Sequence, residues 1–168
     1  MIVKPILVFA YGNPSRGDDA LGPQLLARLI NNTDINLSEI EFLTDFQLQI
    51  EHALDLEQRQ LVLFADASVS CKTQFAWHQL KPKQDSSYTT HAMNPEAVLQ
   101  VYKSIKKQSP PPCFLLSIQA EQFELGEGLS AIARQNLQLA YDFCLRLLSD
   151  PSLTKWQKLS GNARNIAA

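Results

Sequence analysis

Short apolar runs of the β type alternate with helical patterns along this sequence, and this alternation constrains the fold more than any other feature. Residues 5–10 and 61–65 are continuous apolar runs, typical of strands that are buried on both faces of a sheet. Between these runs, leucines recur at helical spacing, at Leu21, Leu25, Leu26 and Leu29. We therefore expect an α/β fold, a three-layer α/β/α sandwich with a mostly parallel central sheet.

The remaining strands fit the same architecture. Residues 40–44 predict a second strand, and residues 113–118 predict the last buried one. Residues 73–80 alternate apolar with polar side chains, which favours an antiparallel edge strand. The polar segment 81–90 contains a proline and predicts a mobile loop.

Three further segments predict helices. Residues 48–57 have a helical pattern in which Ile50 and Leu54 are expected to face inward, with Ala53 as a further candidate. Asn94 and the proline after it are an N-cap and a first helical residue, and predict a helix that ends near residue 107. Residues 132–148 are amphipathic and predict the closing helix.

Length and composition limit the domain organisation. The chain has 168 residues, of which 45% are hydrophobic, enough for one substantial core. We expect one domain over residues 1–150. Residues 151–168 contain little periodicity, and we expect a loosely ordered C-terminal tail.

Charge and cysteine usage limit the partners. The net charge is −2 and the basic residues are scattered, which argues against a nucleic-acid partner. No apolar stretch approaches the roughly 20 residues that cross a bilayer, and the N-terminal apolar run predicts a strand and not a signal peptide. The three cysteines are far apart in sequence, which fits reduced thiols in a cytoplasmic protein. We expect a monomer.

Two adjacent carboxylates, Asp18 and Asp19, lie where the first strand gives way to a helix. The spacing of Gly12 and Gly17 is similar to that of a phosphate-binding loop, but the acid pair replaces the Lys-Ser/Thr of such loops. Two negative charges repel a phosphate and attract a cation. The loop therefore predicts a cation site.

Two further residues are expected to converge on this loop. Ligands of open α/β sheets bind beyond the carboxyl ends of the strands. Asp66 ends the central strand there, and His91 lies just before a helix that starts at the same edge. Asp19, Asp66 and His91 make a ligand set of two carboxylates and an imidazole, which suits nickel, zinc or cobalt and leaves the coordination sphere open.

Simpler roles remain open for each of these residues. Asp18 is either a helix N-cap or a catalytic base. Asp66 has the character of a residue that ends a strand in a turn, and His91 that of an ordinary loop histidine. His52 and His78 are expected to be surface or groove residues.

Four segments, in order, carry a resemblance to a known family. Residues 12–22, Gly-Asn-Pro-Ser-Arg-Gly-Asp-Asp-Ala-Leu-Gly, resemble the Gly-Asn-x-x-x-x-Asp-Asp/Glu-Gly-x-Gly signature of the hydrogenase maturation endopeptidases. Residues 61–67 resemble the family's strand that ends in Asp-Ala. Residues 91–95 resemble its His-x-x-Ser/Thr/Asn-Pro step, and residues 118–130 resemble its late loop.

The resemblance implies an α/β/α cytoplasmic endopeptidase. Members of the family remove a C-terminal extension from the large-subunit precursor of a nickel-iron hydrogenase after nickel has been inserted. The family's metal-contacting positions match Asp19, Asp66 and His91 here. The resemblance implies that nickel arrives with the precursor, so that the enzyme holds no permanently bound cofactor.

The sequence departs from the family pattern at two places. Ala20 replaces a common glycine. Residues 44–48 stand where many members have Asp-Gly-Gly-Thr, and they end in a Gln-Leu pair that is similar to the branch associated with bidirectional, NAD-linked hydrogenases. The roles of Asp45 and Glu51 stay open.

Two mechanisms and two other functions remain to be separated. Nickel either polarises the scissile carbonyl or activates a water, or it only positions the peptide while Asp18 or Asp19 acts as base. An alternative function is a nonenzymatic metal-binding or assembly protein that recognises the loaded precursor. Peptidyl-tRNA hydrolase also has a Gly-Asn-Pro near its first strand, but the basic face that it needs is absent.

Overall fold

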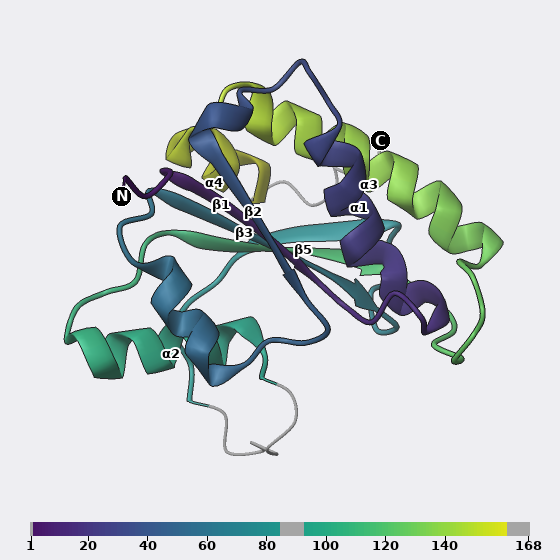
Figure 1. Ribbon diagram of the computed structural model, residues 1–168, viewed down its shortest axis with the longest axis horizontal. Coiled ribbons are helices and arrows are strands. Elements are labelled where there is room, and N and C mark those ends of the chain that lie inside the picture. Colours follow the sequence, from purple (N-terminus) through teal and green to yellow (C-terminus); the bar gives the residue numbers. More distant parts are fainter. Residues whose placement is uncertain (1, 85–92, 161–168) are drawn as a thin grey trace.

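A five-stranded sheet forms the centre of the molecule. The computed structural model describes residues 2–84 and 93–160. The strand order is β2-β1-β3-β5-β4, with all neighbours parallel except the antiparallel pair β4 and β5. This confirms the mostly parallel sheet with an antiparallel edge strand (Figure 1). The strands are β1 (Ile6–Tyr11), β2 (Ile40–Asp45), β3 (Leu61–Ser68), β4 (Phe75–Gln79) and β5 (Cys113–Gln119).

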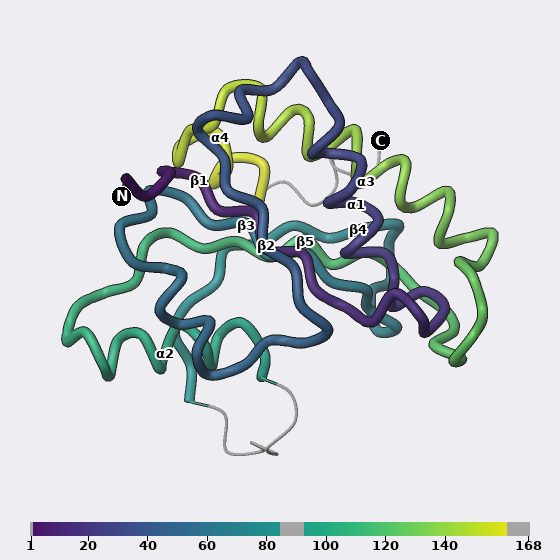
Figure 2. The backbone as a smooth tube through the Cα atoms, in the orientation of Figure 1, coloured from purple at the N-terminus to yellow at the C-terminus, as the bar shows by residue number. Residues whose placement is uncertain are grey.

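Helices cover both faces of the sheet and complete the three layers. Figures 1 and 2 show α1 (Leu21–Ile30) and α3 (Ala131–Ser149) on one side and α2 (Pro95–Lys106) on the other. The second face also carries the 3-10 helix η3 (Ile50–Leu56), which packs against α2. In the described ranges, no helix combines the length and apolar character that a membrane crossing requires.

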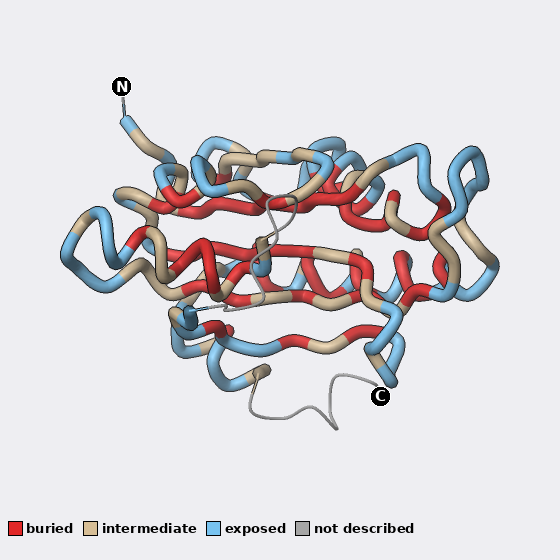
Figure 3. Tube along the Cα trace, turned by 90° about the horizontal axis from the view of Figure 1, so that it is seen from below, coloured by how far each residue is buried: buried red, intermediate tan, exposed pale blue. Residues whose placement is uncertain are grey.

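Alternating residues of each central strand supply two separate cores. Val8 and Ala10 of β1 belong to the cluster under α1 and α3, whereas Leu7 and Phe9 belong to the cluster under α2 and η3. Successive side chains of a strand point to opposite faces, so a strand buried on both faces must be apolar throughout. Figure 3 shows the buried segments in the middle of the layers and the exposed ones in the connecting loops.

The strand order places the two acidic sequence positions at one edge. β1 and β3 are direct neighbours, with Ala10 opposite Ala65. The chain leaves β1 after Tyr11, and Asp66 follows Ala65 on β3. The loop that carries Asp19 and the end of β3 therefore meet at the carboxyl edge of the sheet.

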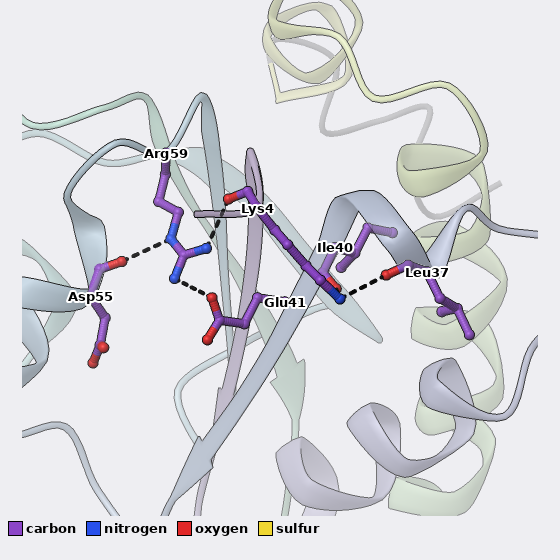
Figure 4. Close-up of polar contacts among 6 residues, drawn as sticks. All are labelled: Lys4, Leu37, Ile40, Glu41, Asp55 and Arg59. Atoms are coloured by element: carbon purple, nitrogen blue, oxygen red, sulfur yellow. Dashed lines mark hydrogen bonds and ion pairs between the residues drawn. The ribbon is translucent and has the colours of Figure 1, made fainter. Parts of the chain in front are cut away.

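A polar cluster holds the opposite, amino edge together (Figure 4). Arg59 donates to the carboxylate of Glu41 on β2 at 2.5 Å, to the carbonyl of Lys4 at 2.8 Å and to the carbonyl of Asp55 at 3.0 Å. The Lys4 ammonium donates in turn to the carbonyls of the β2 entry, at Leu37 and Ile40. These bonds tie the starts of β1, β2 and β3 together, far from the predicted site.

The expected helix over residues 48–57 is shorter and tighter than predicted. It is the 3-10 helix η3, with three residues per turn. Ala53 and Leu56, which are three residues apart, lie on the buried face of this helix. Ile50, the first residue of the helix, and Leu54 are 53% and 55% exposed. The prediction that Ile50 and Leu54 face inward is wrong.

Residues 151–160 also differ from the expected loose tail. They contain α4 (Leu153–Ser160), whose Trp156 is 0% exposed. The Trp156 indole donates to the carbonyl of Leu147 at 3.0 Å, and the Trp77 indole donates to the carbonyl of Trp156 at 3.1 Å. A single aromatic residue thus anchors the segment. Residues 161–168 of the expected tail, and most of the loop expected over 81–90, lie outside the described residues.

We predict that Trp156→Ala lowers the free energy of unfolding by about 3–5 kcal/mol, because it empties a buried site and removes an indole donor. Chemical denaturation measures the effect. Lys158→Ala, at an exposed position of the same helix, serves as the control and should change stability by less than about 0.5 kcal/mol. Equal stability of Trp156→Ala and the control would contradict the anchoring role.

Candidate active site

A polar pocket of about 730 Å³ lies at the carboxyl edge of the sheet. Its walls come from the ends of β1 and β3, the middle of β5, His78 of β4, the loop after β2 and the start of α2. Three carboxylates line it, those of Asp19, Asp66 and Glu96, together with Tyr11 and His78. The position is the one that open α/β sheets use for ligands.

The loop after β1 presents Asp19 to this pocket through a close backbone turn. Gly12 has φ +146°, and a Cβ there would lie 2.0 Å from the carbonyl oxygen of Asp19, so only glycine fits. The backbone N–H of Asn13 donates to Asp19 Oδ2 at 2.7 Å. The turn therefore fixes the Asp19 carboxylate at the pocket wall.

Asp66 is half-buried, and its pKa depends on this burial and on the nearby Asp19. Burial and the negative charge of Asp19 raise the pKa of Asp66 to about 7, against smaller lowering effects of hydrogen bonds from the Ala67 backbone and the Tyr11 side chain. Asp66 is thus divided between its neutral and ionised forms near neutral pH. A cation beside the two acids would offset only the part of the rise that comes from the Asp19 charge.

The two acids alone do not complete a metal site. Across residues 2–84 and 93–160, no group of three His, Cys, Asp or Glu side chains has the geometry to hold a metal ion. The structure brings Asp19 and Asp66 to one pocket, as predicted, while His91 lies outside the described residues. A cation at this place would need at least one further ligand besides Asp19 and Asp66.

Asp18 does not line the pocket, and it joins the loop after β1 to the segment that leads into α3. It is 0% exposed and its carboxylate accepts four hydrogen bonds: from the backbone of Glu121, Gln122 and Ser130, at 2.9, 3.3 and 2.7 Å, and from the Ser130 hydroxyl at 2.8 Å. Desolvation alone would raise the pKa of Asp18, but these donors lower it below its ordinary value. Asp18 is neither a helix N-cap nor a good candidate for the base, because it does not line the pocket.

His52 and Asp45 form a pair that supports the pocket wall. His52 Nδ1 accepts from the backbone N–H of Gln49 at 2.8 Å, and His52 Nε2 lies 3.2 Å from Asp45 Oδ2. Both nitrogens are engaged, so this imidazole serves the loop that leads from β2 into η3. Glu51 is exposed and does not line the pocket.

Tyr11, Glu96 and His78 are pocket residues that the sequence analysis did not assign to the site. Tyr11 reads as the last residue of a buried strand, and Glu96 as an ordinary acid in a first helical turn. His78 is exposed, as expected, but the antiparallel pairing of β4 places it beside Leu115 on the pocket side. Of these three residues, only Tyr11 had a signal in the sequence that could have placed it in the site, because it is a polar residue at the end of an otherwise apolar strand.

Solved structures of hydrogenase maturation proteases share this fold. The nickel-iron hydrogenase maturation protease HycI from Thermococcus kodakarensis is 19% identical, with a TM-score of 0.66 over 88% of this chain and 94% of that one. The hydrogenase maturating endopeptidase HybD from E. coli is 22% identical, with a TM-score of 0.67 over 85% and 91%. A hydrogenase 2 maturation peptidase from a Thaumarchaeota archaeon is 22% identical, with a TM-score of 0.62 over 86% and 98%.

No protein-family model matches the sequence, and no curated protein matches it. At identities of 19–22% the likeness to the solved structures establishes the shared α/β fold. The matches cover 85–88% of this chain and 91–98% of the solved structures, so most of the fold is shared.

We predict that Asp18→Asn lowers the free energy of unfolding at pH 7 by on the order of 3 kcal/mol, because the amide cannot accept all four hydrogen bonds. Since the pKa of Asp18 is lowered in the folded state, this stabilisation is lost as the pH falls through that value. Urea denaturation at pH 7 tests it against the exposed control Asp34→Asn. Equal stability of the two variants would contradict the structural role.

We predict that Asp66→Asn makes the protein more stable at alkaline pH. With a folded pKa of about 7 against an unfolded value of ~3.9, wild type loses stability as the pH rises from about 4 to about 7. Asparagine avoids this loss, so the variant should gain up to ~4 kcal/mol near pH 8 and only ~1.5 kcal/mol near pH 5. Denaturation curves at both pH values measure the gap, and a pH-independent gap would rule out the raised pKa.

Proposed function

We propose that this chain is an endopeptidase that removes the C-terminal extension of a nickel-loaded large-subunit precursor of a nickel-iron hydrogenase. The observation that carries the proposal is the meeting of Asp19 and Asp66 in one pocket, on a fold shared with hydrogenase maturation proteases. The order of the four sequence segments supports the same assignment. We place the reaction in the cytoplasm, where the three free cysteines would stay reduced.

In this proposal the nickel belongs to the substrate. Asp19, Asp66 and His91 complete the coordination of nickel that the precursor brings with it, and the protein needs no resident metal. The raised pKa of Asp66 supports nickel binding as the first step. The negative charge of Asp19 contributes to this rise, and a divalent cation offsets that charge. A precursor without nickel meets two carboxylates that repel each other, so recognition depends on the metal.

The hydrolytic step requires a water, a base and a proton for the leaving amine. The water adds to the scissile carbonyl carbon, and its proton passes to a pocket carboxylate and then to the amine as the peptide bond breaks. The products are a large subunit with a new C-terminal carboxylate and a released peptide. We assign this transfer to Asp19 or Asp66, which line the pocket, and not to Asp18, which is held by its four donors.

The loop after β2 supports a narrower substrate class. Gln47 and Leu48, the pair that resembles the bidirectional, NAD-linked branch, line the pocket beside Phe46. Gln47 is half-buried and can contact a bound precursor directly, whereas Leu48 is 1% exposed and packs in the core behind it. We therefore propose a large subunit of that hydrogenase class as the substrate, processed by a monomer.

We predict that the purified protein shortens a nickel-loaded precursor at its C-terminus and leaves the nickel-free precursor intact. Intact-mass spectrometry measures the loss of the C-terminal peptide. Asp19→Asn, Asp66→Asn and His91→Ala should each lower the rate by about 100-fold or more, because each removes a ligand or a proton acceptor. The exposed Asp142→Asn on α3 is the matched control and should retain the wild-type rate.

Two outcomes would contradict the proposal. Tight binding of the loaded precursor without any mass loss would make the chain a nonenzymatic assembly protein. Undiminished cleavage by a normally folded His91→Ala would remove His91 from the ligand set.

A further inference from the structure

The pocket extends across the sheet, with its acids between two ends. The strand order places β2 on one side of β1 and β3, and places β5 and β4 on the other side. Asp19 comes from the loop after β1 and Asp66 from β3, whereas the pocket reaches from the loop after β2 to His78 on β4. With strands about 4.8 Å apart, four spacings give a span of roughly 19 Å, which an extended peptide of about six residues covers.

The end at β2 is apolar and open to solvent. Phe46 lines the pocket there and is 63% exposed, so its ring packs little against the core. The backbone N–H of Met93 donates to the carbonyl of Leu48 at 3.3 Å, which joins the start of α2 to the loop that carries Phe46. Aromatic side chains and methionine are enriched where proteins bind partners. This end of the pocket suits an apolar side chain of a bound molecule.

The end at β5 and β4 is polar. Ser117 is opposite Asp66 in the parallel pairing of β3 with β5, so the two side chains share one face of the sheet. Ser68, Ser70 and His78 also line this end, and the hydroxyls of Ser68 and Ser70 lie 3.1 Å apart. Within residues 2–84 and 93–160, neither the Ser117 hydroxyl nor the His78 ring has a hydrogen-bond partner. Their polar atoms are available to a bound molecule.

We propose that these two ends make the pocket selective on both sides of the peptide bond that is cut. Phe46 contacts an apolar side chain of the precursor on one side of that bond, and Ser117 and His78 form hydrogen bonds with a polar side chain on the other side. The inference rests on the proposed function, because it takes the precursor as the occupant of the pocket. Phe46, Ser117 and His78 determine specificity, whereas the proton transfer is assigned to Asp19 or Asp66.

The two ends discriminate by different physical effects. An apolar side chain that covers Phe46 leaves water, which is favourable in proportion to the apolar area buried, and a serine there gains little. At Ser117 and His78, an apolar side chain would remove water from hydrogen-bonding groups without giving them a partner, which is unfavourable. A precursor whose apolar and polar flanking residues are exchanged is therefore expected to be a poor substrate.

Cleavage of nickel-loaded precursors with altered flanking residues is the first test. Leucine or serine is placed at each of the three positions on either side of the cut, and intact-mass spectrometry gives kcat/KM. We expect wild type to prefer leucine on one side and serine on the other, by about 10-fold each. Phe46→Ala should reduce only the first preference to within about twofold, and Ser117→Ala combined with His78→Ala should do so only for the second.

Two substitutions on α3 are the matched controls. Leu139 is an apolar residue that is 43% exposed, Ser149 is an exposed serine, and neither lines the pocket. Leu139→Ala and Ser149→Ala should keep both preferences. If Phe46→Ala and the double variant lose a preference on the same side, or if neither loses one, the inference is overturned and the proposed function remains. If wild type cleaves no precursor, the proposed function fails.

Binding of short peptides to the wild-type protein is the second test and needs no cleavage. The probes are six-residue alanine peptides with leucine at one end and serine at the other, and the readout is the shift of backbone amide NMR signals. Replacing the leucine by alanine should remove the shifts at Phe46 and Met93 alone. Replacing the serine by alanine should remove those at Ser117 and His78 alone. Shifts that both ends lose together, or no shifts at either end, would overturn the inference.

Discussion

The repulsion between Asp19 and Asp66 is the interaction on which the site depends. It exists because β1 and β3 are parallel neighbours, which brings the loop after one strand to the end of the other. Burial is the main cause of the raised pKa of Asp66, and the Asp19 charge adds to it, so that the pKa reaches about 7.

The rest of the carboxyl edge is built to hold this arrangement. Gly12 permits the turn that fixes Asp19, and Asp18 ties that turn to the loop before α3. The pair of Asp45 and His52 supports the wall that carries Gln47 and Leu48. The adjacent acids Asp18 and Asp19 thus have different roles, one in stability and one in the pocket.

The convergence of Asp19 and Asp66 could be predicted from the sequence, because the alternation of strands and helices restricts the strand order and places site residues at the carboxyl edge. The role of Asp18 could not be predicted, since its partners Glu121 and Ser130 are 103 and 112 residues away. The sequence pattern also failed to predict which side chains of η3 are buried, and it failed to predict the burial of Trp156. At both places tertiary packing decides which side chains are buried.

The most direct test of the account is the affinity of the protein for the precursor with and without nickel. We expect the loaded precursor to bind at least about 100-fold more tightly than the nickel-free one, and this ratio to collapse toward one when Asp19→Asn and Asp66→Asn are combined. Equal affinity of wild type for the two precursors, or an unchanged ratio in the double variant, would contradict the claim that Asp19 and Asp66 recognise the nickel of the precursor.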